Sequence, residues 1–348
     1  MTMTRPAPAE LGYAMPAEWA PHQATWISWP HNPETWPGCL PEAETAMVAA
    51  VRALAAGETV RINVLDSDHE GHVRNLLGLL ADSPAVVFHV IPTNDAWCRD
   101  HGAIFLRDGA GQLAAVDCGF NAWGGKYPPW DRDDAVAARM AVILDLPRFD
   151  GGMILEGGSI DVNGAGALLT TEQCLLNPNR NPGLSRAEIE ERLQLLFGIQ
   201  QVLWLGDGII GDDTDGHVDD ITRFVGQDRV ITVVESDPAD PNHAPLADNL
   251  ERLRSMRLAD GRPLRIIELP MPEPVELHGE RLPASYGNFY IGNQVVLMPA
   301  FEQPRDELAA RILARSLPGR RVIPIRANEL VTGLGAFHCL TQQVPAAG

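Results

Sequence analysis

Four separated stretches of the chain carry side chains with reactive groups. Asp100 ends a Trp-Cys-Arg-Asp sequence, and Glu156 precedes a pair of glycines. His217 and Asp219 lie two residues apart in Asp-Gly-His-Val-Asp, and Cys339 ends Gly-Ala-Phe-His-Cys. A thiol, an imidazole and several carboxylates that meet at one centre suit covalent attack by the thiol on a cationic carbon. These five residues are therefore the first candidates for a catalytic site.

Each of these side chains also has an ordinary structural explanation. Asp100 follows an arginine with which it could pair, and His217 stands beside a polar turn, where a structural histidine would be hydrogen-bonded. A free cysteine such as Cys339 is most often a buried, inert side chain, and Cys98 has a comparable claim because it is close to Asp100. Since residues i and i+2 of a strand point to one face, His217 and Asp219 are expected to face one ligand.

The acidic stretch Gly211–Asp220 raises the question of a metal site. An EF-hand loop with Gly216 at its sixth position would place Gly211 at the first position and Thr222 at the twelfth, where acidic residues are required. A zinc site would need further histidine or cysteine at short spacing, and the HExxH pattern is absent. No glycine pattern fits a phosphate-binding loop either. We therefore predict neither a metal nor a nucleotide cofactor.

The overall composition limits the class of protein and of partner. The chain has 348 residues, 45% of them hydrophobic, which is enough to bury a large core. Its formal charge is -19, so nucleic acid and anionic membranes are not expected partners. A small cationic substrate suits this charge, although acidity also serves solubility. No apolar run reaches the roughly 18 residues of a membrane span.

The cysteines indicate a reducing compartment. Their number is odd, their spacing is wide, and no CxxC pair occurs, which argues against a disulfide framework and a structural zinc site. The first ten residues contain no apolar core of signal-peptide length. We therefore expect a cytoplasmic protein. The five cysteines are Cys39, Cys98, Cys118, Cys174 and Cys339.

Hairpin signals recur along the chain and alternate with helical patterns. Turn residues between β-rich runs are typical of hairpins. Between these hairpins, apolar residues recur at helical spacing, which indicates helices. We therefore predict an α/β fold: one domain, residues 1–348, of about five ββαβ-like modules around a pseudo-symmetry axis. The predicted hairpins span 103–116, 159–170, 221–234 and 288–298, with an additional pair at 24–29 and 59–66. The predicted helices span 41–56, 131–146, 185–197, 246–256 and 305–317.

Eight short stretches of the sequence, taken in order along the chain, resemble the agmatine deiminases, a family of the guanidine-modifying pentein superfamily. They also resemble the related bacterial peptidylarginine deiminases. The resemblance covers nearly the whole chain. It implies a five-bladed, pseudo-symmetric α/β propeller (the pentein fold). The stretches are Glu18–Trp26, Trp97–Asp100, Asp117–Gly125, Leu155–Ser159, Asn177–Pro182, Gly211–Asp220, Ala284–Tyr290 and His338–Gln343.

The resemblance also implies roles for the candidate residues. Cys339 matches the nucleophile and His217 the general acid/base. Asp100 and Asp219 match the two carboxylates that grip a guanidinium, and Glu156 matches the residue that supports the histidine. The implied reaction converts agmatine and water to N-carbamoylputrescine and ammonia through an amidino-cysteine intermediate, a step toward putrescine, with no cofactor.

Further implications concern the rest of the substrate pocket and the assembly. Trp97 is expected beside the alkyl part of the substrate, and Asp213 is a candidate acceptor for its terminal ammonium. The family suggests a homo-oligomer. The chain departs from the family's usual pattern at Cys118, Gly287 and 333–337, which bears on the shape of the pocket.

Two other functions remain open from the sequence. A deiminase of peptidyl-arginine, or of another small guanidine compound, would need an open cleft. A non-catalytic guanidine-binding protein on the same fold would bind the substrate without converting it.

Overall fold

Five sheets with the same strand pattern make up most of the β structure. The structure is a computed structural model and describes residues 6–348. In each sheet two antiparallel strands are followed by a third strand parallel to the second. Four sheets have three strands: β4(Ile104–Arg107)–β5(Leu113–Gly119)–β6(Arg148–Ile154), β7(Asp161–Val162)–β8(Ala167–Thr171)–β9(Gln201–Leu205), β10(Thr222–Gly226)–β11(Arg229–Val234)–β12(Arg265–Pro270) and β15(Tyr290–Ile291)–β16(Val295–Ala300)–β17(Arg321–Arg326).

The fifth sheet joins strands from opposite parts of the sequence. Its order is β18(Thr341–Pro345)–β1(His22–Ser28)–β2(Thr59–Val64)–β3(Val86–Val90). Ile27 pairs with Thr341 in the antiparallel ladder between β1 and β18. A separate hairpin, β13(Glu276–Leu277)–β14(Glu280–Arg281), completes the β structure of the described residues.

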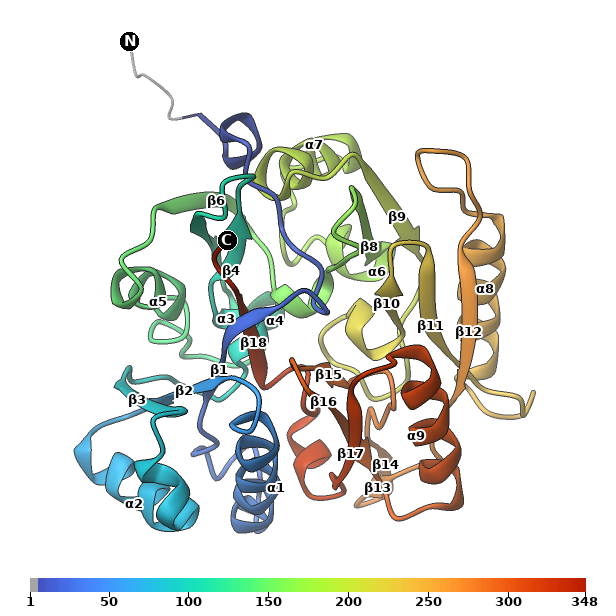
Figure 1. The fold of residues 1–348 in the computed structure, drawn as a ribbon. Coiled ribbons are helices and arrows are strands. Elements are labelled where there is room, and N and C mark those ends of the chain that lie inside the picture. The colour runs from blue at the N-terminus through green and yellow to red at the C-terminus, as the bar shows by residue number, and fades with distance from the viewer. Residues whose placement is uncertain (1–5) are drawn as a thin grey trace.

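Helices supply the crossovers that parallel strand pairs require. Figure 1 shows the longer of these helices toward the outside of the molecule, with the short helices α3(Cys98–His101), α4(Ala122–Gly125) and α6(Glu172–Leu175) nearer its middle. The fold is therefore mixed α/β, as predicted. The crossover helices are α1(Leu40–Leu54), α2(Ser67–Leu77), α5(Val136–Ile143), α6(Glu172–Leu175), α7(Arg186–Phe197), α8(His243–Ser255) and α9(Pro304–Ser316).

Helix α7 shows how local sequence sets these boundaries. The Ser185 side chain accepts the N–H of Glu188, and the Glu188 carboxylate accepts the N–H of Ser185, so the two residues form a capping box at the start of the helix. Gly198 ends the helix with φ 64°, a left-handed conformation that glycine adopts without steric cost.

Most predicted elements are present with altered bounds. The hairpin at 103–116 is confirmed, and helix α8 begins three residues before its predicted start. The first strand predicted at 159–170 is reduced to Asp161–Val162, because Gly157–Ser159 forms a 3-10 turn. Similarly, β15 begins at Tyr290 and not at Asn288.

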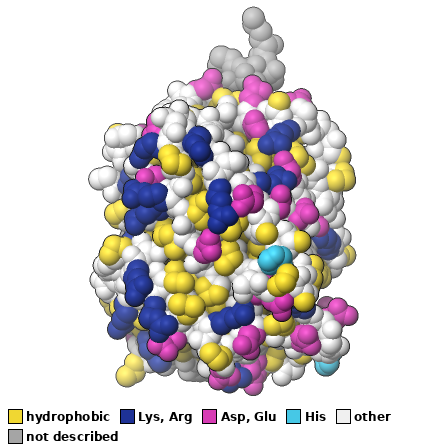
Figure 2. All heavy atoms as spheres, turned by 90° about the vertical axis from the view of Figure 1, so that its right-hand side faces the viewer, with side chains coloured by type: hydrophobic (Ala, Val, Ile, Leu, Met, Phe, Trp, Pro, Cys, Tyr) yellow, Lys and Arg dark blue, Asp and Glu magenta, His cyan; other side chains and the backbone are white. Residues whose placement is uncertain are grey.

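The outer surface carries interspersed charges of both signs. On the face over α8 and α9, basic and acidic side chains lie close to one another (Figure 2). Arg252 lies 2.7 Å from Asp248 on α8, and Arg311 pairs with Glu307 on α9. Such exposed pairs contribute about 0–1 kcal/mol each. Within residues 6–348, no helix combines the length and the apolar character that crossing a membrane requires.

Candidate active site

A cavity of about 450 Å³ leads to the predicted nucleophile. Trp97, Asp100 and Cys339 line it and are each 5% exposed, so they form its deep part. Exposed lining residues such as Glu34 and Lys126 mark its mouth. Lys126 is the single lysine of the sequence, and its ammonium pairs with Asp215 at 2.9 Å.

Asp100 enters the site from the short helix α3. Its carboxylate accepts the indole N–H of Trp123 and the backbone N–H of Gly158, both at 3.0 Å. A Cβ on Gly158 would lie 2.6 Å from His217 Nδ1, 2.8 Å from Asp100 and 3.0 Å from Asp219. The glycine that follows Glu156 by two residues is therefore needed because three catalytic candidates crowd against its backbone.

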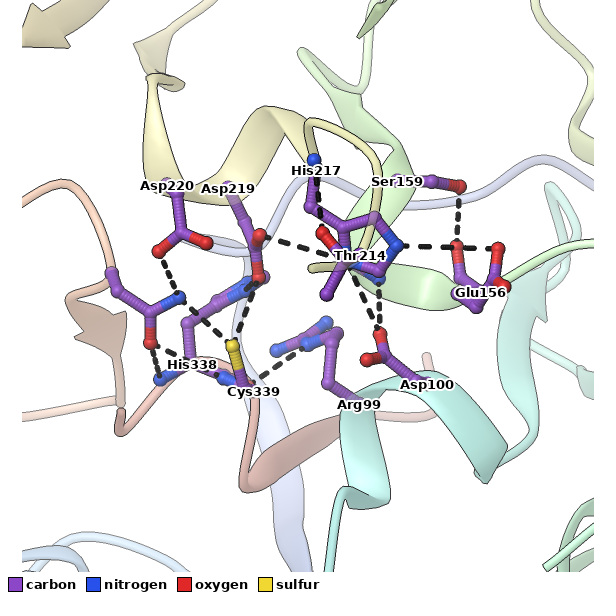
Figure 3. A network of polar contacts seen from close by, with 12 residues as sticks. Arg99, Asp100, Glu156, Ser159, Thr214, His217, Asp219, Asp220, His338 and Cys339 are labelled. Atoms are coloured by element: carbon purple, nitrogen blue, oxygen red, sulfur yellow. Dashed lines mark hydrogen bonds and ion pairs between the residues drawn. The ribbon is translucent and has the colours of Figure 1, made fainter. Parts of the chain in front are cut away.

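His217 lies in the middle of the carboxylates (Figure 3). Its Nδ1 is 3.8 Å from Asp100 Oδ1 and 4.0 Å from Asp219 Oδ1, and its Nε2 is 4.0 Å from Glu156 Oε2. The ring is fully buried, and neither nitrogen has a hydrogen-bond partner among residues 6–348. Imidazole and carboxylates are thus close enough for charge interaction while the ring remains available for proton transfer.

The prediction that a β-strand places His217 and Asp219 on one face was wrong. His217 and Asp219 do not share the face of a strand: Val218–Asp220 forms a 3-10 turn, and β10 begins only at Thr222. The backbone N–H of His217 is held by Asp212 and Thr214, each at 3.2 Å. The turn, and not strand alternation, brings the two side chains together.

Glu156 is anchored from behind by an arginine. Arg180 Nε lies 2.6 Å from Glu156 Oε1, and both side chains are fully buried. Arg180 also donates to the backbone oxygen of Thr214 and to Asp215. It therefore fixes Glu156 and the loop that leads to His217 in one arrangement.

Asp219 belongs to a second buried network of charges. His338 Nδ1 donates to Asp219 at 2.6 Å, and His338 Nε2 donates to Glu18 at 2.8 Å. The guanidinium of Arg223 lies 2.8 Å from the same Glu18 oxygen, and that of Arg99 lies 3.2 Å from it. Asp219 is thus tied through an imidazole to a carboxylate that two arginines hold.

Cys339 lies in the turn just before β18. Its sulfur is 3.8 Å from Asp219 Oδ2 and 3.0 Å from Asn288 Nδ2. A Cβ on Gly335 would lie 2.6 Å from the Trp97 ring and 3.1 Å from Cys339 Cβ. Glycine at 335 therefore lets Trp97 pack directly against the turn that carries the thiol.

Burial and neighbouring charges shift the pKa values of these groups in opposite directions. Burial would lower the pKa of His217, but Asp100, Cys174 and Asp219 outweigh it and hold that pKa well above its usual range. Burial, followed by the charges of Asp219 and other nearby carboxylates, raises the pKa of Cys339 well above the usual thiol value. The free site therefore favours an imidazolium beside a neutral thiol.

The two proposed guanidinium ligands also differ in pKa. Burial raises the pKa of Asp100 to about 6; the charge of His217 opposes this, and those of Asp219 and Glu156 add to it. Burial would also raise the pKa of Asp219, but the hydrogen bond and charge of His338 outweigh it and lower that pKa.

Other sequence-predicted residues have mixed outcomes. Trp97 lines the cavity, and its contact with the alkyl part of a substrate stays a prediction. Asp213 lines it too, but its carboxylate already accepts the hydroxyl of Tyr127. Cys98 does not line the cavity; it is fully buried in an apolar cluster, and burial raises its pKa to about 12. Cys98 is therefore not a second nucleophile candidate.

One group in the site has side chains of metal-binding type. Ligand atoms of Glu156, Cys174 and His217 lie within 4.8 Å of one another. However, the guanidinium of Arg180 is 2.6 Å from Glu156, so a divalent cation held there would lie against a fixed positive charge. The group fits proton transfer between His217 and Glu156 better than it fits a metal.

Several site residues were missed by reasoning from single side chains. Each lies inside a stretch that carries the family resemblance, which is the signal that could have drawn attention to it. None has a local pattern that reveals its partner, because the partners lie far away in the sequence. The missed residues are Glu18, Trp123, Arg180, Asn288 and His338.

Comparison with known proteins places the chain among the guanidine-modifying enzymes. Residues 14–345 match the family described as Porphyromonas-type peptidyl-arginine deiminase. The agmatine deiminase of Ectopseudomonas mendocina is 39% identical, and the alignment covers 99% of each chain.

Two solved structures of agmatine deiminases are similar over nearly their whole length. The enzyme of Enterococcus faecalis, described as catalysing its reaction, has a TM-score of 0.93 at 33% identity, covering 99% of both chains. A cysteine-to-serine variant of the C. jejuni enzyme with substrate bound has a TM-score of 0.86 at 32% identity, covering 96% of this chain and 97% of that one.

Proposed function

Because the chain belongs to the Porphyromonas-type peptidyl-arginine deiminase family, we propose that it hydrolyses agmatine to N-carbamoylputrescine and ammonia. The observation that carries this proposal is the cluster at the end of the cavity. There a thiol, an imidazole and three carboxylates lie within 4.0 Å of one another in a chain of contacts. The protein is an enzyme of the agmatine deiminase type.

The first half of the reaction forms a covalent intermediate. Asp100 and Asp219 bind the guanidinium through paired N–H···O⁻ contacts. The thiol proton of Cys339 leaves to solvent as the cation binds, and the sulfur attacks the central carbon. The His217 imidazolium gives its proton to one amino group, the C–N bond breaks, and ammonia leaves. The product is an amidino-cysteine.

The second half consumes water. His217, now neutral, removes a proton from a water molecule that attacks the same carbon. The C–S bond breaks with its electron pair returning to sulfur, the remaining hydroxyl proton leaves to solvent, and a neutral ureido group is released. Glu156 lies 4.0 Å from Nε2 of His217 and stabilises the imidazolium that re-forms. The proposed chemistry uses no metal or organic cofactor.

The rest of the cavity favours a substrate with a cationic tail. Its lining includes the carboxylate of Glu34 and the carboxyl groups of Asp95 and Asp133, and its one lysine, Lys126, is paired with Asp215. Burial raises the pKa of Asp95, and raises that of Asp133 to about 7, so a cation that binds there also favours their ionised forms. Agmatine ends in an ammonium, which this surface attracts, whereas the carboxylate of free arginine would be repelled. Asp213 remains a candidate contact for that ammonium once it is released from Tyr127.

We also infer the finer features of the fold and assembly. The five sheets are the blades of a five-bladed propeller within one domain, an inference supported by their shared strand pattern and by the pairing of β1 with β18. We propose a homo-oligomer without nucleic-acid or membrane partners. A cytoplasmic location in a route to putrescine fits the five unpaired cysteines and the chemistry of the product.

The test is release of ammonia and ureido product from purified protein with agmatine, arginine and a blocked arginyl peptide, each with chelator present. We expect turnover of agmatine alone. Cys339→Ser should lower it by about four orders of magnitude or more while binding persists. Faster turnover of the peptide would establish a peptidyl-arginine deiminase instead. Retained turnover in Cys339→Ser would rule out the covalent mechanism, and binding without turnover by the wild type would indicate a binding protein.

A further inference from the structure

Asn288 touches the sulfur that is proposed to attack the substrate. Its side chain is 1% exposed and lies just before β15. Nδ2 is 3.0 Å from Cys339 Sγ and 2.9 Å from Asp220 Oδ1. Oδ1 accepts the backbone N–H of His338 at 3.0 Å and that of Cys339 at 3.4 Å. All of these groups are buried.

These contacts fix which end of the amide faces the sulfur. A backbone N–H can only donate, so the oxygen of Asn288 must face His338 and Cys339. The NH₂ group then has one hydrogen for Asp220 and one for the sulfur. Turning the amide over would place the nitrogen against two N–H groups and the oxygen against a carboxyl oxygen. The donor therefore points at Cys339.

Such a donor matters because most of the surroundings of the sulfur oppose a negative charge. Burial, followed by the charges of Asp219, Asp220 and Asp100, raises the pKa of Cys339, and a backbone hydrogen bond at Ala336 acts in the opposite direction. As a neutral thiol the sulfur donates to Asp219 at 3.8 Å. As a thiolate it can only accept, and among residues 6–348 the side-chain donor within reach is the amide of Asn288.

We propose that Asn288 is a catalytic residue that donates a hydrogen bond to the Cys339 thiolate. This inference rests on the proposed function and deepens it. Before attack, the hydrogen bond stabilises the deprotonated sulfur, whose proton has left to solvent. When the C–S bond of the amidino-cysteine breaks, the electron pair returns to sulfur and the same N–H stabilises the departing thiolate.

The first experiment measures the thiol without any substrate. Iodoacetamide alkylates thiolates, and peptide mass spectrometry separates Cys339 from the four other cysteines. The rate of alkylation at Cys339 is followed against pH in the wild type and in Asn288→Ala, with circular dichroism to establish that both are folded. We expect the midpoint to rise by about one to two pH units, the size of a lost hydrogen bond to a charged group. An unchanged midpoint would overturn the proposal.

A second variant and a matched control separate this role from a structural one. Asn288→Asp keeps an oxygen for the N–H of His338 but puts a carboxyl group against the sulfur, so its midpoint should rise at least as far. Ser285→Ala removes a hydrogen bond to the backbone oxygen of Asp220 in the same turn without touching the sulfur. The control should match the wild type. A shift as large in Ser285→Ala, or a wild-type midpoint in Asn288→Asp, would show that Asn288 only supports the turn.

Steady-state kinetics with agmatine complete the test. Asn288→Ala should lower kcat by about 10- to 100-fold and leave KM within about threefold, because the carboxylates that grip the guanidinium remain. A rise in KM alone would assign Asn288 to substrate binding and contradict the proposal. Alkylation needs no substrate, so failure of agmatine as substrate would leave the thiol result standing.

Discussion

The two carboxylates proposed to hold the guanidinium, Asp100 and Asp219, are buried in opposite environments. Asp100 accepts two neutral donors, the indole of Trp123 and the backbone of Gly158. Asp219 accepts from His338, which in turn donates to Glu18. Burial raises the pKa of Asp100 to about 6, whereas the contact with His338 overcomes burial and lowers that of Asp219.

This difference shows how a buried site can hold two neighbouring carboxylates that titrate at different pH values. Two adjacent buried carboxylates cannot both ionise cheaply. Asp219 is ionised beforehand because a fixed cationic network compensates it. Asp100 faces the buried imidazole of His217 at 3.8 Å, whose charge lowers the pKa of Asp100 without outweighing burial. The guanidinium therefore adds more compensation at Asp100 than at Asp219, which the cationic network already stabilises.

The largest effects are expected when Asp100 and Asp219 are neutralised separately, which tests whether their surroundings differ. We expect Asp219→Asn and Asp100→Asn each to lower kcat/KM for agmatine by about 10³-fold or more, since each removes a charge-assisted contact in a buried site. Asp219→Asn should lower the free energy of unfolding more than Asp100→Asn does, by about 3–5 kcal/mol, because it leaves the charge network around His338 unbalanced. Urea unfolding of both variants is the measurement. Equal stability losses would mean that the environments do not differ as described.

A smaller effect on kcat/KM is expected when the hydrogen bond from His338 to Asp219 is removed. His338→Ala removes the donor at 2.6 Å, so the pKa of Asp219 should rise and kcat/KM should fall by about 10- to 100-fold. His338→Asn, which can place an N–H near the position of Nδ1, should recover part of the loss. The pH profile of kcat/KM is the decisive readout: an acid limb that stays in place in His338→Ala would contradict the assigned role.

The smallest effect concerns the neutral donors of Asp100. Its pKa of about 6 means that the carboxyl is protonated below that pH, so kcat/KM should fall there by about tenfold per pH unit. The hydrogen bond from Trp123 lowers this pKa, so Trp123→Phe should move the acid limb upward and cost a few-fold in kcat/KM at pH 7. A pH profile of both proteins with agmatine tests this. If the acid limb of Trp123→Phe moved to lower pH, the hydrogen bond from Trp123 would not lower the pKa of Asp100.

The parts of the fold that sequence alone could predict are the local ones. The hairpin around Arg107–Gln112 and the capped start of α7 depend on residues a few positions apart. Four of the third strands, β6, β9, β12 and β17, were not located from the sequence, because parallel pairing leaves no turn signal and these strands lie partly exposed. The strand predicted at 59–66 is confirmed as β2. In β17, Arg321 and Arg326 are exposed, so the strand lacks the apolar alternation that would identify it.

The residues of the site also fall into those that the sequence could predict and those that it could not. Cys339, His217 and Asp100 were identifiable because their residue types and motifs carry chemistry by themselves. Glu18 and His338 were not, since they meet across 320 positions of sequence, and neither side chain alone indicates the other. Asn288 gave no chemical signal of its own beyond its place in a stretch that carries the family resemblance, because an asparagine at the start of a predicted strand is ordinary until its amide is found against a thiol.

The pairing of β1 with β18 has a consequence for how the protein reaches its active form. Helices such as α7 close over short segments and need nothing distant. The turn that carries Cys339 leads directly into β18, and β18 pairs with β1, so the nucleophile takes its place beside one of the longest-range contacts in the molecule. Contacts of high sequence separation form slowly. In a refolding experiment, recovery of enzyme activity should therefore trail recovery of helical signal and mark the end of folding.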